Sequence, residues 1–201
     1  LENLNFKILK GDIVAITGKN GSGKTTLLNI IAGLLKPNSG KIILDEISQN
    51  FFNNLEWNKK ISYVQQNIFL IDATIKENIM IADLNSKKFD VISEQLSLTS
   101  FFSNLPDGLD TRVGADGAYL SGGQKQIISI ARALIKDSEI ILLDEPDSAL
   151  DKNNTKILKN ILLKIKGDKT VIMISHSDSV FDECFDKKFL INDGKILEKT
   201  I

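Results

Sequence analysis

Short runs of consecutive apolar, mostly β-branched residues recur along the chain, and segments with helical periodicity lie between them. Four runs are prominent, at residues 13–17, 61–64, 140–143 and 170–174. Runs that stay apolar at successive positions are typical of strands buried on both faces of a parallel sheet. The pattern therefore predicts a mostly parallel central sheet.

Three segments between these runs carry apolar residues at helical spacing, at 25–35, 124–135 and 151–166. Gly167 is expected to end the third, because glycine readily adopts the left-handed conformation found after helix ends. Strands that alternate with helices in this way indicate a layered α/β fold.

Two further segments refine this outline. Residues 74–105 look mostly helical and contain no strong strand, which predicts a helical insertion. Residues 189–197 have the pattern of a hairpin with its turn at 192–194, where the sequence is Asn-Asp-Gly.

Composition excludes several functions. The 201 residues include 25 Lys or Arg and 26 Asp or Glu, and this near-neutral balance argues against a nucleic-acid binder held by phosphate contacts. The single cysteine, Cys184, excludes an internal disulfide and a multi-cysteine zinc site. No apolar run approaches the roughly 20 residues that span a bilayer. Because the chain starts at Leu1 rather than Met, we expect it to be part of a longer protein.

A glycine-rich motif follows the first predicted strand and opens the first predicted helix. Residues 18–25 read GKNGSGKT, which fits the pattern G-x-x-x-x-G-K-[ST] of a phosphate-binding loop. Its glycines let backbone N–H groups surround phosphate oxygens, and the helix start directs its positive end at the same anion. The residues predicted to bind nucleotide here are Gly18, Asn20, Gly21, Ser22, Gly23, Lys24, Thr25 and Thr26.

A second acidic element follows the third apolar run. Asp144 and Glu145 end residues 140–143, which places them at the carboxyl edge of the sheet, where α/β proteins bind ligands. Neighbouring carboxylates at a strand end point in different directions. We expect Asp144 to hold a metal together with Thr25, and Glu145 to polarise water at the γ-phosphate.

A second candidate anion site precedes the helix at 124–135. The sequence Leu-Ser-Gly-Gly-Gln at 120–124 offers exposed N–H groups, a hydroxyl and a helix dipole. Alone, Ser121, Gly122, Gly123 and Gln124 would be read as a loop with an N-cap. Beside a phosphate loop they suggest that one nucleotide uses both helix starts, the second supplied by another copy in a two-fold sandwich.

Together these motifs resemble the nucleotide-binding domain of ABC transporters, with a Walker A loop, a Walker B strand, the signature LSGGQ and the run DEPDSALD at 144–151. The resemblance covers residues 1–201. It implies a P-loop NTPase core with a mostly parallel sheet, an N-terminal β region and a helical subdomain at about 74–135.

The resemblance also implies roles for single residues. Gln66 corresponds to the Q-loop glutamine, which senses Mg²⁺ and contacts the membrane domain. Asp151 corresponds to the D-loop aspartate, and His176 to the switch histidine at the γ-phosphate. The implied cofactors are ATP and Mg²⁺, with the metal at Thr25, Gln66 and Asp144, and Lys24, Gln66, Glu145 and His176 as the catalytic set. Trp57, Tyr63 and Phe6 are expected to be core or surface aromatics rather than adenine platforms.

The expected partners are a transmembrane domain, in the same or a separate chain, and a second nucleotide-binding domain; no nucleic acid is expected. This places the chain at the cytoplasmic face of the cell membrane. Segments 69–79 and 111–117 resemble those of exporters, although Arg112 and Ala115 stand where acids are usual. The alternatives are an importer's ATPase subunit, a soluble ABC-type ATPase acting on ribosomes or DNA, and a regulator without turnover. The cargo is not readable from the sequence.

Overall fold

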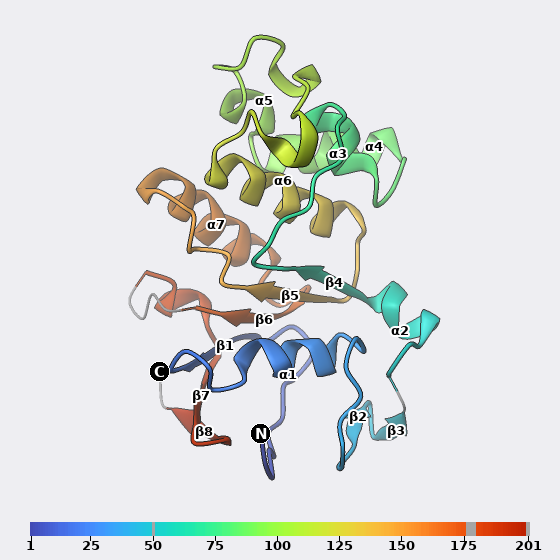
Figure 1. Ribbon diagram of the computed structural model, residues 1–201, viewed down its shortest axis with the longest axis vertical. Coiled ribbons are helices and arrows are strands. Elements are labelled where there is room, and N and C mark those ends of the chain that lie inside the picture. The colour runs from blue at the N-terminus through green and yellow to red at the C-terminus, as the bar shows by residue number, and fades with distance from the viewer. Residues whose placement is uncertain (50, 176–179, 200–201) are drawn as a thin grey trace. The chain divides into compact units, whose positions relative to one another are not determined.

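The computed structural model describes residues 1–49, 51–175 and 180–199 (Figure 1). Its chain forms two compact units, each built from segments that are separate in the sequence. The first unit comprises Leu1–Tyr63, Ser138–Glu145 and Ile165–Ile201. The second comprises Val64–Asp137 and Pro146–Lys164.

A six-stranded sheet forms the centre of the first unit, in the order β4-β5-β6-β1-β7-β8. The β5–β6, β6–β1 and β1–β7 pairs are parallel and the β7–β8 pair is antiparallel, which confirms the mostly parallel sheet. The strands are β1 (Ile13–Gly18), β4 (Ile61–Val64), β5 (Ile140–Asp144), β6 (Thr170–Ile174), β7 (Lys187–Asn192) and β8 (Lys195–Lys199).

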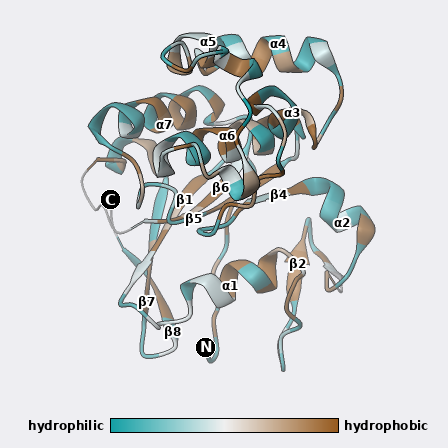
Figure 2. Ribbon diagram, turned by 45° about the horizontal axis from the view of Figure 1, so that its top comes forward, coloured by the Kyte–Doolittle hydropathy of each residue, from teal (hydrophilic) through white to brown (hydrophobic). Residues whose placement is uncertain are grey.

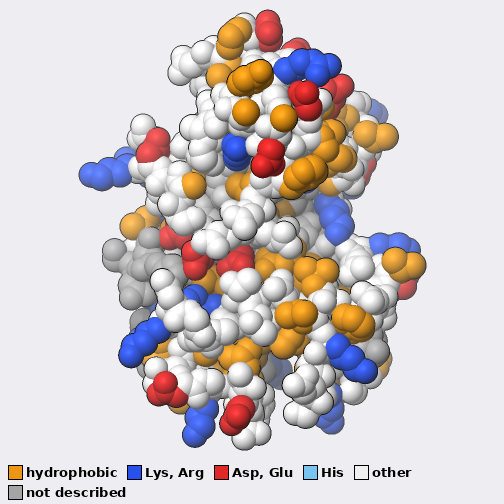
Figure 3. All heavy atoms as spheres, viewed as in Figure 1, with side chains coloured by type: hydrophobic (Ala, Val, Ile, Leu, Met, Phe, Trp, Pro, Cys, Tyr) orange, Lys and Arg blue, Asp and Glu red, His pale blue; other side chains and the backbone are white. Residues whose placement is uncertain are grey.

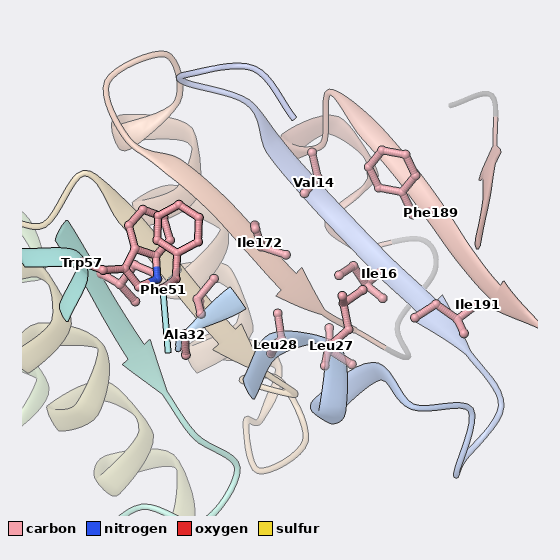
Figure 4. Close-up of a cluster of buried hydrophobic side chains, with 13 residues drawn as sticks. Val14, Ile16, Leu27, Leu28, Ala32, Phe51, Trp57, Ile172, Phe189 and Ile191 are labelled. Carbon is pink, nitrogen blue, oxygen red and sulfur yellow. The ribbon is translucent and has the colours of Figure 1, made fainter. Parts of the chain in front are cut away.

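One face of this sheet is covered by helix α1 (Lys24–Ile31). Leu27 and Leu28 of α1 lie in a buried cluster with Val14 and Ile16 of β1 and with side chains from β5, β6 and β7 (Figure 4). Alternate residues of β1 point toward α1 because side chains on a strand alternate between faces. The burial fixes α1 against the strand that precedes it.

The cluster extends to a short helix and a small hairpin. Phe51 and Trp57 are buried in it, and the Trp57 indole donates a 2.7 Å hydrogen bond to the Ile31 carbonyl. Trp57 is therefore a core residue, and Phe6 is packed at the edge of the same cluster, as predicted. These elements are β2 (Ile42–Leu44), β3 (Ile47–Gln49) and α2 (Leu55–Lys60).

The second unit is helical. Helices α3 (Ile75–Met80) and α4 (Ser86–Gln95) pack on the 14-residue helix α6 (Gly122–Ile135). Their buried residues include Ile75, Ile79, Phe89, Ile127 and Ile128. The remaining elements of the chain are α5 (Leu98–Phe101), α7 (Lys152–Ile165) and the 3₁₀ turns η1 (Gly108–Asp110), η2 (Ala115–Gly117) and η3 (Asp182–Cys184).

Figure 2 shows how hydropathy follows these elements. Hydrophobic colour concentrates on the strands, whereas α2 and α7 carry hydrophilic stretches along their lengths. Of the described residues, none belongs to a helix that is both long and apolar enough to cross a membrane.

One predicted boundary differs from the structure. The helix expected at 25–35 ends at Ile31, because Gly33 adopts a φ of 74° and turns the chain away. The stretch 74–105, expected to be mostly helical, contains α3, α4 and α5, as predicted. Gly167 has a φ of 83°, as expected for a residue that follows a helix end.

Candidate functional site

The glycine-rich loop connects β1 directly to α1, as the motif predicts. Gly18, Gly21 and Gly23 have φ values of 149°, 77° and 97°, a region that other residues rarely adopt. A Cβ atom on Gly18 would lie 2.4 Å from the carbonyl oxygen of Ile191. The loop therefore needs glycine both for its backbone conformation and for its close approach to β7.

Lys24 holds this loop from inside. It is 6% exposed, and its Nζ donates hydrogen bonds to the carbonyl oxygens of Gly18 and Lys19 at 2.9 and 3.1 Å. These bonds place the ammonium group within the turn of the loop. Its positive charge is thereby fixed beside the start of α1, where the helix dipole also favours an anion.

Ser22, in the same loop, carries a hydroxyl oxygen that is buried and, among the described residues, lacks a hydrogen-bond partner. Buried polar groups are nearly always paired, so an orphan in a phosphate-binding motif indicates a group suited to bind a ligand. Gly23, the N-cap of α1, provides no side-chain hydrogen bond to the first N–H groups of the helix. The residues present therefore fit a polyphosphate.

Asp144 ends β5 opposite the loop, within the first unit. Its Oδ1 accepts a 3.3 Å hydrogen bond from the Thr25 hydroxyl, which brings together the two residues predicted to hold a metal. Asp144 is 3% exposed, and this burial raises the pKa of its carboxyl above the ordinary value. The hydroxyl of Thr25 opposes that shift, because it donates to the ionised form.

This donor set fits Mg²⁺. The ion binds hard oxygen ligands and usually takes one or two carboxylates from the protein, with phosphates and water completing its coordination. Within the described residues, no three His, Cys, Asp or Glu side chains gather as an all-protein metal site. A hydroxyl and one carboxylate beside a phosphate loop are what a nucleotide-bound Mg²⁺ requires.

Glu145 has the left-handed backbone conformation, with a φ of 50°. Its N–H donates a 3.1 Å hydrogen bond to the carbonyl of Ile174, the last residue of β6. Strained backbone of this kind persists where surrounding bonds hold it, and it is common at functional sites. His176, the predicted switch histidine, lies outside the described residues.

The signature residues belong to the second unit, at the start of α6. Ser121 is the N-cap: its Oγ accepts from the Gln124 N–H at 3.2 Å, and its own N–H donates to Gln124 Oε1 at 2.8 Å. This reciprocal pair is a capping box. Ser121 and Gly122 are exposed, so the dipole end of α6 faces solvent in this chain.

The other predicted residues of the second unit are Gln66 and Asp151. Gln66 is exposed and follows β4 by two residues. Asp151 Oδ1 accepts a 2.8 Å hydrogen bond from the Asn154 N–H at the start of α7. The two exporter-like segments lie side by side, since Val113 N–H donates to Ala73 O at 2.9 Å and Ile75 N–H to Thr111 O at 3.1 Å.

Sequence reasoning missed two residues near these sites. Tyr63 packs against the core, as predicted, and its hydroxyl in addition donates to Asp144 Oδ2 at 3.3 Å, a contact that the sequence did not indicate. Arg132 of α6 donates to Phe69 O at 2.9 Å and to Asn78 O at 2.9 Å, so it joins the signature helix to the segment 69–79. In each case the available signal was a polar group within an otherwise apolar element, the hydroxyl of Tyr63 in β4 and the guanidinium of Arg132 in α6.

Comparison with known proteins agrees with this geometry. The family model described as ABC transporter matches residues 1–148. The chain is 36% identical over 200 residues to the putative ABC transporter ATP-binding protein MG015 of Mycoplasma genitalium, covering 98% of this chain and 34% of that protein. It is 35% identical over 202 residues to the ATP-dependent lipid A-core flippase of Idiomarina loihiensis, covering 99% and 34%.

A solved structure gives the same result. A bacterial Atm1-family ABC exporter with ATP bound superposes with a TM-score of 0.89 at 30% identity, over 97% of this chain and 35% of the exporter chain. The chain thus spans about a third of the length of these proteins. The predicted fold and family are confirmed: the chain belongs to the ABC transporter family.

Proposed function

We propose that this chain is the ATP-hydrolysing domain of an exporter-type ABC transporter, working as one of two such domains beneath a transmembrane partner. The observation that carries the proposal is the first unit's phosphate loop, which has an orphaned Ser22 hydroxyl and a Thr25–Asp144 hydrogen bond at its rim. This arrangement supplies donors for phosphate oxygens and oxygen ligands for a divalent cation in one place.

The phosphates would be bound by the loop's N–H groups, the Ser22 hydroxyl and the Lys24 ammonium. Thr25 and Asp144 would hold Mg²⁺, with Gln66 as a third ligand, and the bound ion would neutralise charge on the β- and γ-phosphates. Hydrolysis needs a group that orients water and accepts its proton. Glu145, which directly follows the metal-binding Asp144, is the carboxylate that the chain offers for this step.

The second unit offers what a partner copy would need. Ser121 and Gly122 at the start of α6 are exposed, and Ser121 keeps a hydroxyl proton to donate after its oxygen has capped the helix. We assign this helix start to the γ-phosphate held by another copy, with Asp151 acting across the same interface. Charge on the γ-phosphate would hold the two copies together until hydrolysis releases them.

The transmembrane partner would contact the second unit's segments 69–79 and 111–117. Apolar side chains are exposed there and nearby, as the orange groups over α3 to α5 in Figure 3 illustrate. They include Phe69 at 69%, Ile81 at 54% and Leu84 at 82% exposure. Exposed apolar groups of this kind mark protein interfaces. Relatives named as a flippase and an exporter favour export over import, and a position at the cytoplasmic face of the membrane follows.

The hydrolytic step is tested by Glu145→Gln in the purified protein. ATP binding should persist and turnover should fall by about 10²-fold or more, because the group that accepts the water's proton is gone. Glu198→Gln, on the exposed strand β8, is the matched control and should turn over normally. Wild-type turnover by Glu145→Gln would exclude this role for Glu145.

The shared site is tested by mixing two inactive variants, Lys24→Ala and Ser121→Phe. A mixed pair has one site with both residues intact, so a 1:1 mixture should regain about a quarter of wild-type activity if pairing is random. Circular dichroism should show that each parent is folded. Folded parents whose mixture stays inactive would contradict the two-copy site.

A further inference from the structure

Tyr63 lies beside the carboxylate predicted to hold the metal, although 81 positions separate the two residues. Its strand β4 neighbours β5 in the sheet, and its hydroxyl donates to Asp144 Oδ2 at 3.3 Å. The Thr25 hydroxyl donates to the other oxygen, Oδ1, also at 3.3 Å. The two oxygens of Asp144 thus have different partners: Oδ2 accepts from Tyr63 on strand β4, and Oδ1 accepts from Thr25 in the first turn of α1.

The ring of Tyr63 is held in place. It is half-buried and packs against the hydrophobic cluster that contains Ile61 and Leu142. The neighbouring Ser62 points to the opposite face, is buried, and shares a short hydrogen bond with Ser138, two residues before β5. Packing on one face and a buried hydrogen bond on the other therefore fix where the Tyr63 hydroxyl lies.

We propose that Tyr63 is a positioning residue for Asp144: by occupying Oδ2, it turns Oδ1 toward Thr25 and toward the divalent cation of the nucleotide. The inference rests on the proposed function, in which Thr25 and Asp144 hold that cation. At 3.3 Å the hydrogen bond is long for two oxygens, so we expect it mainly to orient the Asp144 carboxylate and to add little binding energy. Partners that orient a metal ligand in this way commonly change metal affinity by about 10- to 100-fold.

Tyr63→Phe removes the hydroxyl and keeps the ring. The chain has one other tyrosine, Tyr119, which is 75% exposed and lies in the second unit, so Tyr119→Phe is the matched control. Binding of Mn²⁺ would be measured by electron paramagnetic resonance with saturating ATP. Tyr63→Phe should raise the Kd for Mn²⁺ about 10-fold, while ATP affinity in EDTA stays at the wild-type value.

Steady-state kinetics should likewise show an effect on metal binding without an effect on the hydrolytic step. The Mg²⁺ concentration for half-maximal ATPase activity should rise about 10-fold in Tyr63→Phe, and kcat at saturating Mg²⁺ should stay within about twofold of wild type. A purely structural role would lower kcat and the unfolding midpoint together and leave the Mg²⁺ dependence unchanged. That result would overturn the proposal.

Asp144→Asn separates this inference from the proposed function. If Asp144→Asn loses Mn²⁺ binding and Tyr63→Phe binds as tightly as wild type, the role of Tyr63 is refuted and the metal site stands. If Asp144→Asn itself binds Mn²⁺ normally, the assigned metal site fails, and the inference fails with it.

A measurement that leaves Tyr63 in place covers the case in which Tyr63→Phe does not fold. Protein labelled with 3-fluorotyrosine gives two ¹⁹F signals, which Tyr119→Phe assigns. Adding Mg²⁺ to the ATP complex should shift the Tyr63 signal, because its hydrogen-bond acceptor then also binds the ion. A Tyr63 signal that does not move when Mg²⁺ is added would overturn the proposal.

Discussion

Two glycine-rich helix starts, one in each unit, differ in how their N–H groups are satisfied. At α1 the N-cap is Gly23, which makes no side-chain cap, and the buried Lys24 is tied to the loop. At α6 the N-cap is Ser121, which forms a capping box with Gln124. The first start leaves its donors to a ligand, whereas the second satisfies two of its own groups.

This difference explains the division of labour that we propose. An uncapped start that also holds a lysine can bind phosphate by itself, because its free N–H groups and the ammonium group are directed at the same anion. A capped start is stable without a ligand and offers only its remaining donors. It is suited to close over a phosphate that another loop already holds.

The largest expected effect on stability comes from replacing glycine by alanine in the phosphate loop, and the same replacement at the start of α6 should have little effect. Gly18→Ala would bring a Cβ atom to 2.4 Å from the Ile191 carbonyl oxygen at a φ of 149°, so the free energy of unfolding should fall by about 3 kcal/mol. In Gly122→Ala the new Cβ atom would contact only the Ala149 Cβ, at 3.1 Å. Because the position is helical, this substitution should change the free energy of unfolding by less than about 0.5 kcal/mol. Urea denaturation measures both, and equal losses would contradict the contrast.

A smaller effect should depend on pH. Burial raises the folded-state pKa of Asp144 above 3.8, so the folded protein keeps this proton to a higher pH than the unfolded chain. Ionisation of Asp144 therefore costs stability, and this cost grows as the pH rises from 3.8 through the folded-state pKa. Asp144→Asn should be more stable than wild type at pH 7, by a margin that shrinks as the pH falls toward 3.8.

The control for this prediction is Asp193→Asn, which removes an exposed carboxylate from the turn between β7 and β8. Thermal unfolding from pH 4 to 8 measures how much more or less stable than wild type each of the two variants is. If the Asp144→Asn margin is the same at every pH, burial of the charge is not its cause.

Loss of the cap at α6 should have a still smaller effect on the free energy of unfolding. Ser121→Ala removes the acceptor for the Gln124 N–H and should lower the free energy of unfolding by about 1 kcal/mol. Ser129→Ala, inside the same helix, should have no cost, because alanine is the better helix former. Equal effects of the two substitutions in urea denaturation would show that the capping box contributes nothing.

The smallest effect on stability should come from Ser22→Ala, the counterpart at the phosphate loop. Because its buried hydroxyl is an orphan among the described residues, its removal should change the free energy of unfolding by less than about 0.5 kcal/mol, or raise it. ATP affinity should nevertheless fall about fivefold, since a hydrogen bond to a charged phosphate is lost. Calorimetry that finds normal ATP affinity would show that the Ser22 hydroxyl does not contact the nucleotide.

Much of the fold could be predicted, because continuous apolar runs identify buried strands without knowledge of their neighbours. Residues 140–143 and 170–174 were found in this way and are β5 and β6. The hairpin of β2 and β3 was missed, since its turn uses Asp45 and Glu46 at φ values of 48° and 68° rather than a glycine. The end of α1 was misplaced because leucines beyond Gly33 continue the apolar pattern.

The phosphate loop was predictable in the same sense. Its spacing places glycine, lysine and threonine within eight consecutive residues, so local geometry alone dictates a cradle for an anion. The capped start of α6 was equally local, because Ser121 and Gln124 are three positions apart.

The sequence by itself therefore determined the two helix starts and the strands of the six-stranded sheet, since each depends on residues that are neighbours along the chain. Only the tertiary structure decided that β4 lies beside β5 and that Tyr63 and Thr25 share the carboxylate of Asp144. The physical reason is that strand order depends on how whole faces pack against α1. Hydrogen bonds across 81 and 119 positions follow from that packing, and no local pattern encodes them.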